Sequence, residues 1–142
     1  MLQIGPDQAR LWVAVEPIHR QILGVYLSRH RNMIVSESLL RPLIKIYGKK
    51  TVYSDRGTRY PEACISLGLE HRLHSPYEKN TVERTIEYLK DRTDAYDDYP
   101  CMRVGLCNLR HVHEWLTLFI IIRNCGVKSS TKFDDLRRWK YN

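Results

Sequence analysis

The stretch LWVAVEPIHRQILGVYL, residues 11–27, sets two short apolar runs on either side of a polar break. Both runs are rich in β-branched and aromatic residues, and Pro17 stands where the first run must end. Strand formers flanking such a break predict two antiparallel strands. Upstream, LQI precedes a Gly-Pro-Asp turn, which indicates the end of an earlier strand that turns into this pair.

Downstream of this hairpin, patterns typical of helices and strands alternate. Residues 35–47 place apolar side chains at helical spacing up to Gly48, and Pro42 is expected to kink or bound that helix. The other predicted elements are a strand at 51–55, a short helix at 60–69, a strand at 70–75 and helices at about 81–93 and 109–124. This order predicts an α/β fold of the ribonuclease-H-like kind, a mixed sheet with three antiparallel strands and flanking helices.

The composition fits one domain with a basic surface. The 142 residues include 23 Lys and Arg against 16 Asp and Glu, which gives a net charge of +7. An excess of this size favours a polyanionic partner such as nucleic acid, although a basic protein without such a partner is the alternative. No signal peptide is recognisable, so we expect a cytoplasmic, nucleoid-associated protein. The apolar run WLTLFIII, residues 115–122, is too short to span a bilayer and predicts a buried helix.

Two carboxylates are the candidates for chemistry. Asp55 ends the apolar run TVYS, and Glu83 stands in the first turn of the helix predicted at 81–93. Two divalent ions acting on a phosphodiester need carboxylates gathered at strand ends and on an adjacent helix face. Each residue has a structural alternative. Judged without its context, Asp55 is more often a turn residue, here ahead of Gly57, and Asn80 with Glu83 matches a helix capping box.

The same helix is expected to bury Val82, Ile86 and Leu89, which are spaced at i, i+4 and i+7. This stripe leaves Glu83 at the edge of the buried face, a suitable place for a metal ligand. Lys90 lies two turns further on, within reach of a DNA phosphate.

Four segments carry a resemblance to a known family: RHRNM, TVYSDRGTRYPEA, LGLEHRLHSPYEKNTVERTIEYLKDRTDAYDDYPC and CNLRHVHEWLTLFIIIRN. Together they resemble the catalytic domain of archaeal insertion-sequence transposases of the DDE, or integrase-like, superfamily, and most of all the IS6-like group. The resemblance runs from about residue 11 to 125, and residues 68–101 are its most specific part. It divides the chain into a catalytic domain at 1–125 and a basic polar tail at 126–142.

The resemblance implies that Asp55 and Glu83 are catalytic and hold Mg²⁺ or Mn²⁺ in a two-metal site. It also implies cleavage and strand transfer on double-stranded DNA, at transposon ends and target, by a homo-oligomer. The family's first catalytic Asp would fall immediately before Met1, and Arg56 stands where the family has a small residue. We therefore expect an impaired enzyme that lacks its first strand segment. The alternative is a non-catalytic remnant that acts as a DNA-binding or oligomerisation module.

Two further groups of residues have binding potential. Cations expected to contact DNA phosphates are Arg29, Arg31, Lys49, Lys50, Arg84 and Lys90, with an ordinary solvated surface as the alternative. Zinc is a further possibility for the array of Cys101, Cys107, His111 and His113. The spacing is not that of a usual structural zinc site, and two histidines two residues apart on a helix point to different sides. Local contacts or core thiols are the alternative for this array.

Overall fold

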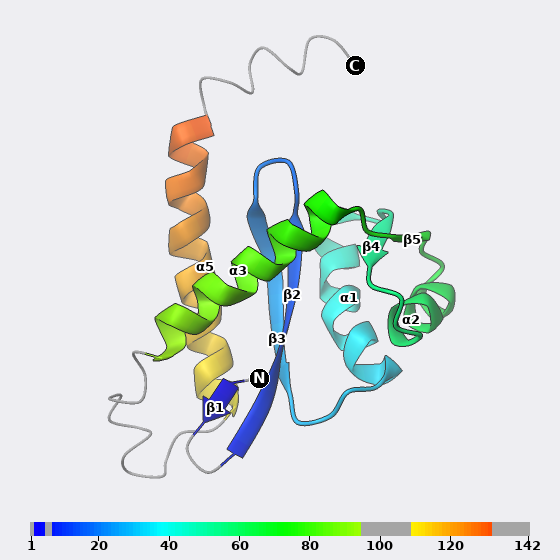
Figure 1. Ribbon diagram of the computed structural model, residues 1–142, viewed down its shortest axis with the longest axis horizontal. Helices are drawn as coiled ribbons and strands as arrows, with labels where there is room; N and C mark the ends of the chain where they lie inside the picture. Colours follow the sequence, from blue (N-terminus) through cyan, green and yellow to red (C-terminus); the bar gives the residue numbers. More distant parts are fainter. Residues whose placement is uncertain (1, 5–6, 95–108, 132–142) are drawn as a thin grey trace.

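The computed structural model describes residues 2–4, 7–94 and 109–131 (Figure 1). Its elements, in chain order, are β1 (Leu2–Ile4), β2 (Asp7–Glu16), β3 (Gln21–Ser28), α1 (Met33–Tyr47), β4 (Val52–Ser54), α2 (Arg59–Leu67), β5 (His71–Leu73), α3 (Pro76–Asp94) and α5 (Leu109–Thr131). The tail from residue 132 onward lies outside the described residues, while α5 continues to Thr131, past the expected boundary at residue 125.

The predicted hairpin is confirmed. β2 and β3 pair antiparallel from Arg10 with Ser28 to Glu16 with Gln21. The register shifts by one residue where Ala14 pairs with Gly24 and Val15 pairs with Ile22. The extra residue on β3 is a β-bulge, which changes which side chains point to each face of the sheet. As a result Ile22 lies on the same face as Val25 and Leu27, and all three are buried.

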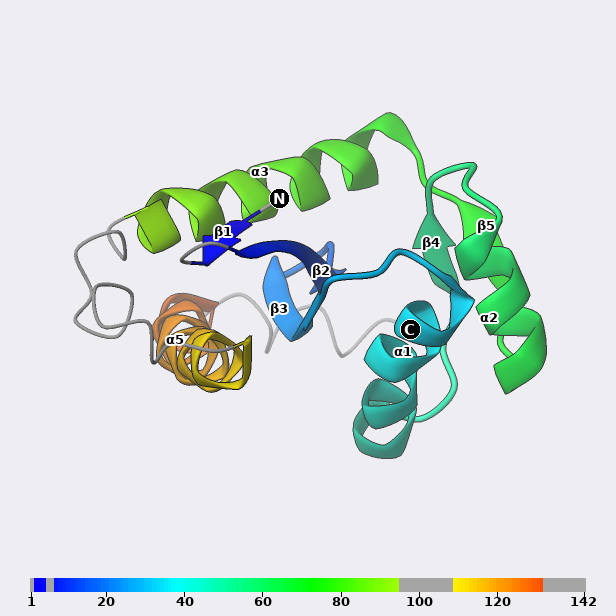
Figure 2. The same ribbon diagram turned by 90° about the horizontal axis from the view of Figure 1, so that it is seen from below.

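The two faces of this hairpin are covered by different helices. Figures 1 and 2 show α5 on one side of β2 and β3 and α1 on the other. On the α5 side, Leu116 and Ile120 pack with the buried residues of β3 and with Leu89 of α3. On the α1 side, Trp12 packs with Val35 and Leu39. This alternation along each strand is the reason that one short hairpin supports two cores.

The expectation of one mixed sheet is wrong for the described residues. β4 pairs only with β5, in parallel, and this pair forms no ladder with the hairpin. The predicted third antiparallel strand is reduced to β1, which pairs antiparallel with the start of β2 through Leu2 with Ala9 and Ile4 with Asp7. The architecture is therefore a long antiparallel pair with a three-residue strand at its edge, and a small separate parallel pair.

Three helices differ from expectation. α1 continues through Pro42 instead of ending there, and its N-cap Asn32 accepts a hydrogen bond from the backbone N–H of Val35 at 3.1 Å. α3 begins at Pro76, five residues before the predicted start, because the cap lies further upstream. The apolar run at 115–122 is only partly buried. Leu116 and Ile120 face the core, whereas the side chains of Leu118, Ile121 and Ile122 are exposed.

Among the described helices, none combines the length and the hydrophobicity that a membrane-spanning segment needs.

Candidate functional site

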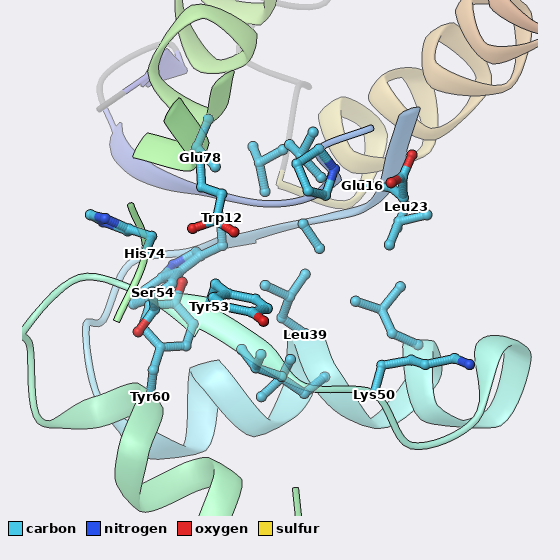
Figure 3. Close-up of a pocket in the computed structure, with 18 of the residues that line it drawn as sticks. Trp12, Glu16, Leu23, Leu39, Lys50, Tyr53, Ser54, Tyr60, His74 and Glu78 are labelled. Atoms are coloured by element: carbon cyan, nitrogen blue, oxygen red, sulfur yellow. The ribbon is translucent and has the colours of Figure 1, made fainter. Parts of the chain in front are cut away.

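A cavity of about 960 Å³ lies between the hairpin, α1, β4 and α3. Figure 3 shows side chains from all of these elements around it, including Trp12 of β2, Tyr53 of β4 and Glu78 of α3. Much of the lining is aliphatic, contributed by Leu11, Val13, Val15, Leu39, Leu40, Leu43, Ile44, Val52, Val82 and Ile86. Four carboxylates also line it: Glu16, Asp55, Glu78 and Glu83. Asp55 and Glu83, which are 28 positions apart in the sequence, therefore line the same cavity.

Asp55 directly follows β4, and the structure shows the turn role considered for it. Its Oδ1 accepts a hydrogen bond from the backbone N–H of Gly57 at 3.1 Å, which is the turn role that Asp commonly takes. Its other carboxylate oxygen accepts no hydrogen bond within the described part of the chain. Asp55 is exposed and lines the cavity, so this second oxygen remains available to a ligand.

A cation that sequence reasoning missed lies beside Asp55. Asp55 Oδ1 and Arg59 Nη2 both lie close to Gly57. A Cβ atom added to this glycine would be 3.0 Å from each of these two atoms. The Arg59 guanidinium also lies 5.8 Å from the centre of the Trp12 ring. Its Nε is buried without a hydrogen-bond partner among the described residues. By contrast, Arg56, the cation expected to disturb the site, is exposed and forms no ion pair with any described residue.

The pKa of Tyr60 depends on its burial and on the charges of Asp55, Arg59 and Arg31. Burial, and after it the negative charge of Asp55, raises the pKa of the Tyr60 phenol to about 12. The positive charges of Arg59 and Arg31 act in the opposite direction. The Tyr60 ring packs edge-on against Trp12, with the ring centres 5.9 Å apart. Asp55 is therefore close enough to a buried phenol to affect its ionisation.

Glu83 lies two turns into α3, not in its first turn as predicted. The capping box expected at Asn80 and Glu83 is wrong, because both residues lie inside the helix. Among the described residues, Glu83 has one ionic contact, with Lys79. The Nζ of Lys79 is 3.7 Å from Glu83 Oε1, and both side chains are more than half exposed. An exposed pair at this distance contributes little stability, so Glu83 is held only weakly.

The buried stripe of α3 is also displaced from the prediction. Thr81, Thr85 and Leu89 are the buried residues. Val82 and Ile86, which were expected to be buried, are half-buried and line the cavity. Glu83 therefore follows a cavity-facing residue and lies at the rim of the cavity.

The other two carboxylates of the cavity are engaged in local structure. Glu16 accepts hydrogen bonds from the backbone N–H groups of Ile18 and His19 and contacts His19 Nδ1 at 3.0 Å, which closes the β2–β3 turn. Glu78 accepts from the Ser75 N–H at 2.6 Å at the start of α3. Asp55 and Glu83 are thus the two cavity carboxylates with the fewest local bonds.

These carboxylates do not amount to a metal site by themselves. Within residues 2–4, 7–94 and 109–131, no group of three or more His, Cys, Asp or Glu side chains lies close enough together to hold a metal ion.

Of the predicted zinc array, Cys101 and Cys107 lie outside the described residues. His113 donates from Nε2 to the Val25 carbonyl at 3.0 Å and packs against Tyr26, so it helps to dock α5 on β3.

The six cations expected to contact DNA do not all line one cavity. Arg31 and Lys50 line the large cavity. Arg84 lines a second, smaller cavity on the neighbouring side of α3. Arg29, Lys49 and Lys90 line neither of these cavities, and Lys90 is half-buried.

The fold and these residues can be compared with known proteins. The structure is similar to the catalytic core domain of BIV integrase, a ribonuclease-H-like protein, with a TM-score of 0.57 and 25% sequence identity over 78% of this chain and 72% of the other. The α/β fold of this chain thus resembles an integrase catalytic core.

In sequence, the chain is 31% identical over 132 residues to the uncharacterized protein MJ0017 of Methanocaldococcus jannaschii. The alignment covers 92% of this chain but 59% of that relative, so the chain spans less than two thirds of the relative's length. No protein-family model matches the chain.

Proposed function

We propose that this chain is the catalytic domain of a DDE-type transposase of the IS6-like group. The observation that carries the proposal is that Asp55, after β4, and Glu83, on α3, line one cavity and are its least engaged carboxylates. The likeness to an integrase catalytic core supports it, because an integrase-like fold generally implies DNA binding and dependence on a divalent metal.

The proposed reaction has two steps on DNA. Water attacks a phosphodiester at the transposon end, the bond from phosphorus to the 3′ oxygen breaks, and a 3′ hydroxyl is released. That hydroxyl then attacks a phosphodiester of the target, and a new phosphodiester forms as a target 3′ oxygen leaves. Asp55 and Glu83 are the carboxylates assigned to the reacting phosphate. Arg31 and Lys50, which line the same cavity, are placed to contact the DNA backbone.

The donor chemistry fits Mg²⁺ or Mn²⁺, but the donor set is incomplete. Both ions favour carboxylate oxygens, and Asp55 and Glu83 supply these. When bound, the metal would activate the attacking oxygen and stabilise the leaving one. Among the described residues, no third potential ligand lies close enough to these two carboxylates to form a metal-binding group, so we derive no step through the ion.

We further propose that the third carboxylate belongs on a strand laid along the free edge of β2. Among the described residues, β1 covers this edge only from Asp7 to Ala9. In the register that pairs Leu2 with Ala9, a strand prolonged towards its amino terminus would run along Arg10–Glu16. This path lies in the aliphatic cavity between β2 and β4, where unpaired backbone edges favour the addition of a strand.

A second candidate function is a non-catalytic module that binds DNA or an intact transposase subunit. Two observations favour it for the chain as it stands. No cluster of three potential metal ligands is present among the described residues, and the Arg59 cation flanks Asp55. A fixed positive charge beside a carboxylate weakens cation binding by like-charge repulsion.

Metal binding by the 142-residue chain tests the site assignment. We expect Mn²⁺, measured by electron paramagnetic resonance, to bind weakly, and Asp55→Asn or Glu83→Gln to abolish this binding. Glu87→Gln is the matched control, since Glu87 is exposed on the same helix one turn further and does not line the cavity. Mn²⁺ binding that is equal in all four proteins would show that Asp55 and Glu83 do not form the site. Wild-type protein that binds duplex DNA but no Mn²⁺ would favour the non-catalytic module.

A further inference from the structure

A second cavity, of about 290 Å³, lies where α3, α5 and the β2–β3 turn meet. It is lined by Arg20, Tyr77, Asn80, Thr81, Arg84, Thr85, Tyr88 and Arg123. Three of these residues are arginines from segments far apart in the sequence, and none of the eight is acidic. The cavity is therefore a positively charged pocket built by the tertiary structure.

The side chain of Arg123, which lines this pocket, is held in place by two contacts. Its Nη1 donates to the Arg20 carbonyl at 3.1 Å, and its guanidinium lies 5.2 Å from the centre of the Tyr88 ring. One residue on, Asn124 exchanges two hydrogen bonds with the backbone of Ile22, at 2.8 and 3.2 Å. These contacts hold α5 against the hairpin, so the pocket does not depend on a single flexible side chain.

The backbone at the turn is also specialised. Arg20 has a φ of 54°, the one positive φ found outside glycine in the described part of the chain. This conformation is uncommon for a residue with a side chain and is held here by the hydrogen bond from Arg123 to the Arg20 carbonyl. Arg20, in this strained turn, is one of the residues that line the pocket.

The charges of Arg20 and Arg84 are not neutralised. Both side chains are exposed, and neither forms an ion pair or a side-chain hydrogen bond with the residues that the structure describes. Arg92 adds a further cation at the edge, with its guanidinium 5.3 Å from the centre of the Tyr88 ring. Gathered guanidinium groups repel one another, and an anion with several acceptor oxygens offsets this repulsion.

We propose that this pocket binds a phosphate group of the DNA backbone. The identity of the ligand rests on the proposed function, while the anion site rests on the arginines alone. Arg84 follows Glu83 on α3, and Thr81 lines both cavities, so a phosphate held here lies on the adjacent side of the helix that carries Glu83. Phosphate contacts of this kind set the register of a duplex without reading its sequence.

The test uses the full chain, a labelled DNA duplex and, separately, inorganic phosphate. We expect Arg84→Gln to lower DNA affinity about fivefold and to reduce the slope of log affinity against log salt by about 0.9, the loss of one phosphate contact. Arg84→Lys should restore part of both. Arg110→Gln is the control, since Arg110 is exposed on α5 but is paired with Glu114 at 2.7 Å.

Nuclear magnetic resonance separates the two sources of phosphate. Inorganic phosphate should shift the side-chain signals of Arg84 and Asn80 in the wild-type protein, and the Asn80 shift should disappear in Arg84→Gln. DNA binding with the same salt slope in Arg84→Gln, Arg110→Gln and wild type would overturn the pocket proposal and leave the proposed function standing. Phosphate shifts without any DNA binding would support the anion site but overturn both its DNA ligand and the proposed function. Absence of both effects would overturn the site itself.

Discussion

Ser75 and Glu78 form a reciprocal cap at the start of α3. The backbone N–H of Ser75 donates to Glu78 Oε2 at 2.6 Å, and the backbone N–H of Glu78 donates to Ser75 Oγ at 3.4 Å. Such a capping box satisfies amides that have no partner within the helix. Because the cap lies here, α3 starts at Pro76, and Glu83 is not needed as a capping residue. This placement leaves Glu83 for the cavity.

The cap predicts opposite effects for two substitutions. Ser75→Ala should lower the free energy of unfolding by about 1 kcal/mol, because the first turn of α3 loses its cap. Asn80→Ala should leave stability unchanged or raise it by a few tenths of a kcal/mol, since Asn80 is exposed inside the helix and Ala is a better helix former. Urea denaturation of both variants measures this. A larger loss from Asn80→Ala would place the cap at Asn80 after all.

Stability at high pH should depend on Tyr60. The pKa of this phenol is about 12 in the folded protein against an ordinary value of 10.0, so the folded state holds the proton more tightly than the unfolded state. The stabilisation is fully present below pH 10 and is lost as the pH rises from 10 to about 12. Across this range Tyr60 should contribute a loss of roughly 3 kcal/mol of folding free energy.

Tyr60→Phe should show a shallower decline of stability than wild type above pH 10, as measured by urea midpoints at several pH values. Tyr77→Phe is the control, because it removes the hydroxyl of an exposed tyrosine on α3. Asp55→Asn should lower the pKa of Tyr60, seen by nuclear magnetic resonance of labelled tyrosine, since one of the charges that raises it is removed. An unchanged pKa in that variant would mean that Asp55 does not face the phenol.

A longer polypeptide should complete the candidate site. We expect the DNA upstream of the Met1 codon, read in frame, to encode a strand with an Asp. Protein expressed with this segment should bind Mn²⁺ about tenfold more tightly than the 142-residue chain, because it adds a charged oxygen ligand.

Amide hydrogen exchange gives an independent measure of the same prediction. Alternate residues within Arg10–Glu16 should become protected in the longer protein, as their free backbone groups gain partners. Equal exchange in the two proteins would argue against a strand in the cavity. A stop codon or frame break upstream would favour the non-catalytic module.

The exposed aliphatic side chains of α5 predict self-association. Leu118, Ile121 and Ile122 are each more than half exposed on one helix, and the homo-oligomer that the resemblance implies would supply a second copy to cover them. Leu118→Lys should convert an oligomer to a monomer in sedimentation equilibrium, whereas Glu87→Lys, at an exposed position on α3, should not. A monomeric wild-type protein would rule out this interface.

Local patterns in the sequence predict most of the elements. The hairpin at 11–27, the strand before Asp55 and the helix that carries Glu83 all follow from runs of strand formers or from helical spacing. The start of α3 was missed although its signal is present. Ser75, Pro76 and Glu78 are a usual N-cap, first helical residue and capping partner. Asn80 and Glu83 match the same pattern, so spacing alone did not choose between them.

Other features have no local signal. The closeness of Arg59 to Asp55 depends on how α2 packs after the turn at Gly57. The exposure of Leu118 and Ile122 depends on which side of α5 meets β3, because an apolar run buries only the side that has a partner. The division into two sheets likewise depends on which strands pair with each other in the folded chain.

The sequence by itself determined the order of helices and strands, the basic charge and the two candidate carboxylates, because each depends on residue type and short-range spacing. Only the tertiary structure decided that Asp55 and Glu83 line one cavity without a close group of three metal ligands among the described residues, and that Arg20, Arg84 and Arg123 line another. The physical reason is that side chains far apart in the chain meet only after helices and strands have packed. Packing depends on the complementarity of whole faces, which no short stretch of sequence contains.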